Sequence, residues 1–203
     1  MSQSSKWSIS FTPSIIANPE MKFGFQVGGV YNIAPRFQFL SSVTTGVIPF
    51  VKPVSDENKY FRFKSECRYI NLKSHDWVRP YVGLQTSFVT SSWKTINSGS
   101  YYEDTFLSDS VVNFSSAKIH SSSVAATIQV GLNTEVLPHL YFDLSLGLGS
   151  KWIITKYLEV IDPIKYERLR PKCGLFLPDP AYRVNGAVSR FQINPTVSFQ
   201  YRF

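Results

Sequence analysis

Apolar and polar residues alternate along most of this chain with a period of two. In residues 22–33, for example, Phe23, Phe25 and Val27 alternate with small or polar residues. Because successive side chains of a β-strand point to opposite faces, this period predicts strands with one apolar and one polar face. Eight such runs occur, at residues 6–13, 22–33, 36–47, 60–72, 80–92, 119–133, 140–150 and 188–203.

The segments that connect these runs alternate between short and long. The short connections are 34–36, 73–79 and 134–139, and the longer ones are 14–21, 48–59, 93–118 and 151–187. Transmembrane β-barrels have this asymmetry, with short periplasmic turns and long extracellular loops. The pattern therefore predicts an all-β fold, in which residues 1–203 form one eight-stranded antiparallel transmembrane β-barrel with both termini periplasmic.

Alternation alone does not tell which face of the strands points inward. A soluble lipocalin-like barrel has its apolar face inside, whereas a membrane barrel has it outside. Here the polar face is rich in Gly, Ser, Thr, Gln and Asn rather than in Lys and Glu, which favours the membrane barrel. Aromatic residues near the run ends also suit interfacial girdles; they are Tyr31, Tyr69, Tyr141, Tyr201 and Phe203 near the short turns, and Trp93 and Trp152 near the long loops.

The composition agrees with a sheet protein. Aromatic residues make up 15% of the 203 residues, against 17% charged residues, and aromatic side chains are enriched in strands. No apolar run reaches the roughly 18 residues of a transmembrane helix, whereas a spanning strand needs only about 9–11. The first residues lack the basic and apolar regions of a signal peptide, so the barrel interpretation expects a mature chain with an added Met1.

The C-terminal segment carries the most specific pattern in the chain. Four apolar residues alternate with polar ones up to the last position; they are Val197, Phe199, Tyr201 and Phe203. This segment resembles the C-terminal signal that the barrel-assembly machinery reads in outer-membrane proteins. Together with Glu66–Asn71, Arg79–Leu84 and Leu137–Gly149, it makes the chain similar to small porin-family outer-membrane barrels of uncharacterised function. The resemblance implies the outer membrane of a Gram-negative bacterium.

A charged group of residues is expected inside the barrel. Run 60–72 places Arg62, Lys64, Glu66 and Arg68 on its polar face, and Asp143 and Arg202 belong to the polar faces of later runs. An eight-stranded barrel is just wide enough for side chains to fill it. Buried charges must be paired, so we expect a structural network that fills the interior. The alternative is a pathway for small anions.

No catalytic or metal-binding arrangement emerges from the sequence. His120 and Ser122, followed by Glu135, resemble the residues of outer-membrane lipid A deacylases, but His120 and Glu135 are fifteen residues apart on one run. At about 3.3 Å per residue that is roughly 50 Å, far beyond hydrogen-bond reach. The three histidines are scattered, and Cys67 and Cys173 lie too far apart for an expected disulfide. We therefore predict a non-enzymatic protein without cofactor or metal.

The long connections are the expected interaction surface. The last one carries several cations, Lys151, Lys156, Lys165, Arg168, Arg170, Lys172 and Arg183. These could bind lipopolysaccharide phosphates or a partner protein, and no nucleic-acid-binding motif is present. The sequence thus predicts an outer-membrane barrel that is structural or an accessory subunit of a cell-envelope complex. Alternatives are a small outer-membrane transporter or pore, and a soluble lipocalin-like ligand-binding barrel.

Overall fold

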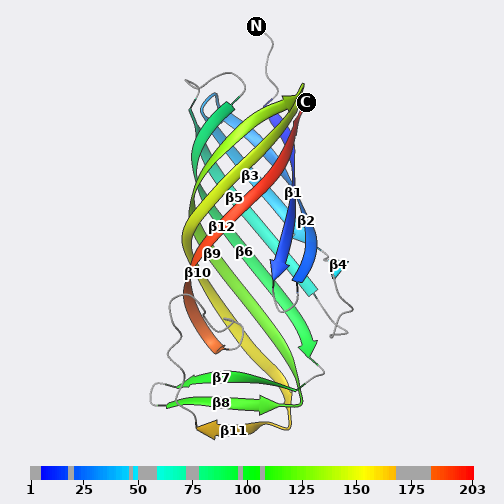
Figure 1. The fold of residues 1–203 in the computed structure, drawn as a ribbon, viewed down its shortest axis with the longest axis vertical. Coiled ribbons are helices and arrows are strands. Elements are labelled where there is room, and N and C mark those ends of the chain that lie inside the picture. Colours follow the sequence, from blue (N-terminus) through cyan, green and yellow to red (C-terminus); the bar gives the residue numbers. More distant parts are fainter. Residues whose placement is uncertain are drawn as a thin grey trace.

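The chain forms a tall barrel of tilted antiparallel strands (Figure 1). The structure, a computed structural model, describes residues 6–17, 21–45, 48–49, 59–71, 78–95, 98–105, 108–167 and 184–203. Its strands are β1 (Trp7–Ala17), β2 (Met21–Ala34), β3 (Phe37–Thr45), β4 (Ile48–Pro49), β5 (Lys59–Ile70), β6 (Val78–Thr95), β7 (Gly99–Thr105), β8 (Ser108–Phe114), β9 (Ser116–Leu137), β10 (Leu140–Ile161), β11 (Ile164–Glu167) and β12 (Val184–Arg202). Among these residues, no helix is long and apolar enough to span a membrane.

Eight of these strands close into a ring in the order β1-β2-β3-β5-β6-β9-β10-β12. The ring closes where β1 pairs antiparallel with β12, with Ile9 opposite Tyr201 and Phe11 opposite Phe199. Closure leaves no unpaired edge in the wall, which is why barrels can span a membrane. The eight predicted runs each correspond to one strand of this ring, so the predicted fold class is confirmed.

Strand β1 begins and β12 ends at the same end of the barrel (Figure 1). We call this the turn end, because β2–β3 and β9–β10 are joined there by two-residue turns, Pro35–Arg36 and Pro138–His139. The second turn is tight enough to hold His139 at a φ of 69°. The opposite end, where β7, β8 and β11 lie, is called the loop end.

The longer connections contain more regular structure than the sequence predicts. The prediction of a loop at 14–21 is wrong. Strands β1 and β2 remain paired as far as Ala17, which lies opposite Met21. The connection 93–118 contains the hairpin of β7 and β8, paired from Gly99 opposite Phe114. In 151–187, β10 continues to Ile161 and is followed by β11, which pairs with β8. Strands β7, β8 and β11 and the last part of β10 lie outside the eight predicted runs.

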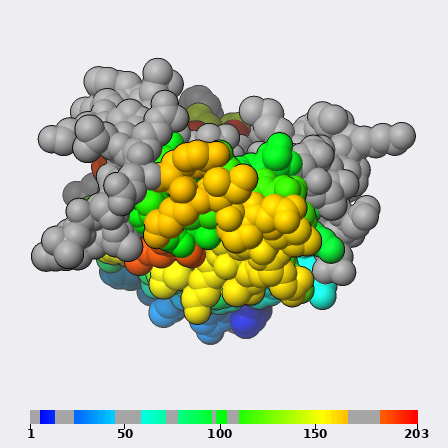
Figure 2. All heavy atoms as spheres, turned by 90° about the horizontal axis from the view of Figure 1, so that it is seen from below, coloured from blue at the N-terminus to red at the C-terminus, as the bar shows by residue number. Residues whose placement is uncertain are grey.

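The strands β7, β8 and β11 form a small sheet across the loop end of the barrel (Figures 1 and 2), and we call it the end sheet. It joins the wall through a short parallel pairing of β7 with β12, at Val184 opposite Tyr102. Seen from below, its residues lie over the middle of the loop end (Figure 2). The end sheet therefore covers this end of the barrel instead of extending away from it.

Candidate functional site

Inside the barrel, Arg68 of β5 forms an ion pair with Asp143 of β10. The two side chains are 1% and 0% exposed. Asp143 also accepts hydrogen bonds from the Tyr81 hydroxyl at 2.9 Å, the Gln200 amide at 3.2 Å and the Asn133 amide at 3.4 Å. These partners come from β6, β12 and β9, so one carboxylate connects five strands of the wall.

Glu66 provides the second carboxylate of this group, which we call the interior network. Its Oε1 lies 2.6 Å from Nε of Arg68, and its Oε2 lies 3.3 Å from Nζ of Lys64. The Arg68 guanidinium also lies 4.1 Å from the centre of the Tyr81 ring. Buried charges are tolerated only when they are paired and hydrogen-bonded. Alternation along β5 brings Lys64, Glu66 and Arg68 together, because residues two apart on a strand lie on the same face.

Glycines of the inner face leave the space that the large polar side chains occupy. A Cβ atom on Gly131 would lie 2.5 Å from Cζ of Tyr81, and one on Gly147 would lie 2.5 Å from Nε2 of Gln129. The side-chain amide of Gln129 in turn donates to the side-chain oxygen Oε1 of Gln85 at 2.7 Å. The Gly-rich polar face seen in the sequence is thus a steric requirement of a filled interior.

Arg202 lies apart from the interior network, at the turn end. It donates to the Tyr141 hydroxyl at 3.3 Å, and that hydroxyl donates to Glu135 at 3.1 Å. The guanidinium groups of Arg202 and Arg79 lie 4.5 and 5.8 Å from the Tyr141 ring centre. The sequence grouped Arg202 with Asp143 by its face alone. Strand position separates them, since Tyr141 is two residues from Asp143 toward the turn.

The loop half of the interior is more basic than the turn half. Arg62 of β5 and Lys151 of β10 are on the inner face of this half, close enough for their charges to interact. Both cations are partly buried. The sequence assigned Lys151 to the last long loop, which is wrong, because β10 carries it in the wall opposite Ala125 of β9.

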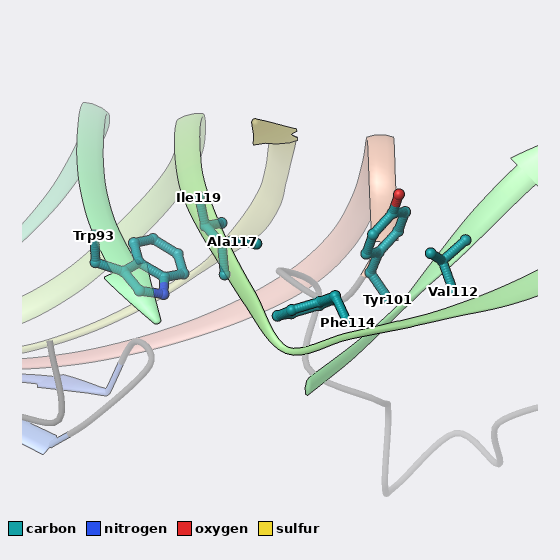
Figure 3. Close-up of a cluster of buried hydrophobic side chains, with 6 residues drawn as sticks. All are labelled: Trp93, Tyr101, Val112, Phe114, Ala117 and Ile119. Atoms are coloured by element: carbon teal, nitrogen blue, oxygen red, sulfur yellow. The ribbon is translucent and has the colours of Figure 1, made fainter. Parts of the chain in front are cut away.

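An apolar cluster closes the interior beneath the end sheet (Figure 3). The wall contributes Trp93 of β6 with Ala117 and Ile119 of β9, and the end sheet contributes Tyr101, Val112 and Phe114. Tyr101 stacks on Tyr157 of β10 with ring centres 4.2 Å apart. Burial and the nearby Glu103 charge raise the pKa of Tyr101 above its ordinary value. Hydrocarbon and aromatic rings therefore pack between the end sheet and the wall at the loop end of the barrel.

The outer face of the wall is apolar. Leu84 of β6, Ile128 of β9 and Ile193 of β12 are 66%, 58% and 61% exposed, although each is large and hydrophobic. The inner face instead carries Gln85, Gln129 and the interior network. A soluble lipocalin-like barrel has the opposite arrangement, so this alternative is wrong. Contiguous exposed apolar surface of this extent needs an apolar surrounding, and the chain is a β-barrel of the outer-membrane type.

Aromatic residues were predicted to form a girdle at each end of the barrel. The girdle at the turn end is present with one correction, and a second correction concerns the loop end. Trp7 packs on Tyr31 at 4.6 Å and Phe37 on Tyr69 at 5.2 Å, all on the outer face. Tyr141 instead points inward and is 6% exposed. At the loop end Trp152 is 50% exposed, but Trp93 is 3% exposed within the apolar cluster. Both errors have one cause, because proximity to a run end does not fix the face of a residue.

Val197, Phe199 and Tyr201, three residues of the predicted C-terminal signal, lie on the outer face of β12, and Phe203 follows the strand directly. Tyr201 and Phe203 are 49% and 62% exposed, and their ring centres lie 5.4 Å apart. Val197 and Phe199 are 38% and 40% exposed on the same face. Phe199 contacts the ring of Phe142 on β10 at 5.6 Å. The four residues thus form one apolar row near the closure of the barrel with β1.

His120 and Ser122 come within reach of each other, whereas Glu135 does not join them. Nε2 of His120 lies 3.4 Å from Oγ of Ser122 on the outer face of β9. Glu135 lies at the turn end, where it binds Tyr141. A Ser–His–acid arrangement needs all three groups in contact. In the described part of the chain, no group of His, Cys, Asp and Glu side chains suits a metal ion.

Other predicted candidates have separate positions. Cys67 is exposed on the outer face of β5, and His139 lies in the second turn. Lys156 lies on the outer face of β10, and Lys165 of β11 binds Glu103 at 2.9 Å. Outside the described residues lie His75, Cys173 and the remaining cations of the last connection, Arg168, Arg170, Lys172 and Arg183.

Solved structures similar to this chain include two proteins. Neisserial surface protein A (NspA) is 14% identical, with a TM-score of 0.46, over 97% of this chain and 95% of its own. A major outer membrane protein from Thermus thermophilus is 12% identical, with a TM-score of 0.42, over 98% and 99%. No protein-family model and no curated protein matches the chain. The barrel fold of this chain rests on its own strand pairing.

Proposed function

We propose that this protein is a non-enzymatic, non-conducting outer-membrane barrel that holds the end sheet at the membrane surface as an interaction surface for another envelope protein. The observation that carries the proposal is the double closure of the interior. The interior network fills the barrel around Arg68 and Asp143, and the apolar cluster fills it at the loop end. An interior occupied in this way supports a role for the outside of the molecule.

The end sheet has the features of such a surface. Ile164 and Tyr166 of β11 are 54% and 51% exposed, and β11 lies in the end sheet at the loop end, beyond the strands of the wall (Figure 1). Beneath them, Val112 and Phe114 of β8 are buried in the apolar cluster. The face of the sheet toward the barrel is therefore packed against the wall. Aromatic and aliphatic side chains remain exposed on the sheet, as at many binding surfaces.

The proposed location is the outer membrane of a Gram-negative bacterium, with insertion by the barrel-assembly machinery. The apolar outer face and the row from Val197 to Phe203 support it. Cell fractionation, followed by gel electrophoresis with and without boiling, tests it. A folded barrel in the outer-membrane fraction migrates differently after boiling. A protein that remains in the soluble fraction without this shift refutes the location.

The partner role is tested by affinity purification in mild detergent. We expect one or more envelope proteins in stoichiometric amount with the wild type, and their loss from the double variant Ile164→Ser, Tyr166→Ser. The matched control is Val82→Ser, Leu84→Ser, which alters two equally exposed residues of the wall at 52% and 66%. A lone barrel in every preparation, or equal loss in the control, contradicts the proposal.

A second candidate function is the passage of small anions, because Arg62 and Lys151 are two partly buried cations on the inner face of the wall. Planar-bilayer recordings separate the two functions. The closed interior predicts no conductance for the wild type. Anion-selective steps that fall when Arg62 and Lys151 are replaced by Gln would establish the second function instead.

A further inference from the structure

A basic patch lies on the outer wall at the loop end, across four neighbouring strands. Strand register places Lys59 of β5 opposite Ser92 of β6, Ser92 opposite His120 of β9, and His120 opposite Lys156 of β10. One row farther from the turn end, Lys94 of β6 is opposite Lys118 of β9. We call the five residues Lys59, Lys94, Lys118, His120 and Lys156 the wall patch.

All five side chains point outward. Their strand neighbours of opposite parity, such as Trp93, Ile119 and Thr155, are buried within the barrel. Lys59, Lys94, His120 and Lys156 are exposed, and the Lys118 side chain is 37% exposed. The patch is thus on the surface that faces the surroundings of the barrel, separate from the basic residues of the interior.

The patch lies toward the loop end from the apolar rows of the wall, and exposed Ile154 and Leu158 of β10 lie on either side of Lys156. The row Phe88, Val124 and Trp152 joins β6, β9 and β10, and these residues are 40%, 49% and 50% exposed. His120 lies four positions from Val124, and Lys156 four positions from Trp152, in both cases toward the loop end. At about 3.3 Å per residue this is about 13 Å along the strand, or roughly 10 Å in height for a strand tilted by about 40°. That height corresponds to the lipid headgroups above the hydrocarbon.

Like charges directly opposite each other destabilise a sheet, yet Lys94 faces Lys118. In the described part of the chain, Glu159 is the carboxylate paired with this patch, at 3.6 Å from Nζ of Lys118. Its side chain is 68% exposed, so the pair is weak. The other three lysines of the patch, Lys59, Lys94 and Lys156, are exposed. Neighbouring strands are about 4.8 Å apart, so the row from Lys59 to Lys156 is about 14 Å wide.

From this arrangement we infer that the wall patch is a binding site for phosphate groups of membrane lipid in the leaflet at the loop end. Lysine binds phosphate as a compact cation, and the Ser92 and Ser122 hydroxyls beside it can donate to phosphate oxygens. The acyl chains would lie on the apolar rows below. This site rests on the proposed membrane location, but it is distinct from the end sheet and its protein partner.

The test uses the full chain folded in phosphatidylcholine nanodiscs that contain a small fraction of diphosphorylated lipid A as the probe. Native mass spectrometry counts the lipid A molecules that remain bound to the released protein. The patch variant is Lys118→Gln, Lys156→Gln, and the control with the same loss of charge is Lys6→Gln, Lys165→Gln. A lysine near a membrane surface contributes about 1 kcal/mol, so we expect an apparent affinity at least about tenfold lower for the patch variant, with the control unchanged.

The outcomes separate the failure of this site from the failure of the proposed location. Equal binding by the patch variant and the wild type, or equal binding of lipid A whose phosphates have been removed, overturns the site. Retention of inorganic phosphate alone, without lipid, also overturns it, because the source would then be the solution. A chain that fails to insert into the nanodiscs at all, and shows no mobility shift on boiling, refutes the membrane location instead.

Discussion

Arg68 and Asp143 are 75 residues apart in the chain, and their side chains meet as an ion pair inside the barrel. Their strands, β5 and β10, are not neighbours, since β6 and β9 lie between them. The pair therefore holds opposite parts of the wall together across the interior. Both side chains are buried. Asp143 has Arg68 as its ion-pair partner, and Arg68 also pairs with Glu66, so the loss of either carboxylate unbalances the charge of the network.

Asp143→Ala is expected to destabilise the barrel by about 3 kcal/mol, because it removes one of the two buried carboxylates paired with Arg68 and leaves the interior network with an uncompensated positive charge. Tyr81, Asn133 and Gln200 lose their shared acceptor at the same time. Urea unfolding of the detergent-folded protein measures the change. Glu159→Ala is the control, since this carboxylate is exposed. Equal stability of the two variants would show that the interior network is dispensable.

Gly131→Ala is expected to destabilise the barrel by about 1–3 kcal/mol through overpacking. The new Cβ atom would lie 2.5 Å from Cζ of Tyr81. Gly29→Ala is a matched control, because a Cβ atom there meets nothing within 4 Å. Adding Tyr81→Ala to Gly131→Ala should remove the clash itself. A G131A variant as stable as G29A would mean that the Tyr81 ring can move aside without cost.

Alkaline pH is expected to loosen the apolar cluster through Tyr101. A phenol whose pKa is raised in the folded state contributes stability below its unfolded pKa of 10.0, and this contribution is lost as the pH rises through the folded pKa. The fluorescence of Trp93, within the cluster, should therefore change above about pH 10. Tyr101→Phe should reduce this change, because Phe does not ionise. An identical titration of both proteins would exclude Tyr101 as the cause.

Phe203→Ala is expected to slow assembly into the membrane while leaving the folded barrel nearly as stable. Phe203 is 62% exposed and contacts the Tyr201 ring, so its removal leaves no buried cavity. Phe191→Ala, which alters a residue 71% exposed on the same strand, is the control. Pulse-chase appearance of the heat-modifiable form in cells measures the rate. Equal rates for the two variants would argue against a signal that ends at Phe203.

The sequence by itself determined the strands of the wall and their two faces. A period of two is a local property, and each of the eight runs carries it without reference to its neighbours. The alternation of Arg62, Lys64, Glu66 and Arg68 therefore placed these residues on one face correctly. The C-terminal row was predicted from alternation and resemblance, and its role in assembly stays a prediction.

Only the tertiary structure decided which of these residues meet. Contacts such as Arg68 with Asp143, or Tyr81 with Gly131, depend on strand order, tilt and register across the barrel, which single runs do not encode. The end sheet was missed for the same reason, because β7, β8 and β11 are short and gain their stability by covering Trp93 and Ile119. The wall patch likewise exists only as a cross-strand row. Its lysines lie far apart in the sequence, and the register brings them together.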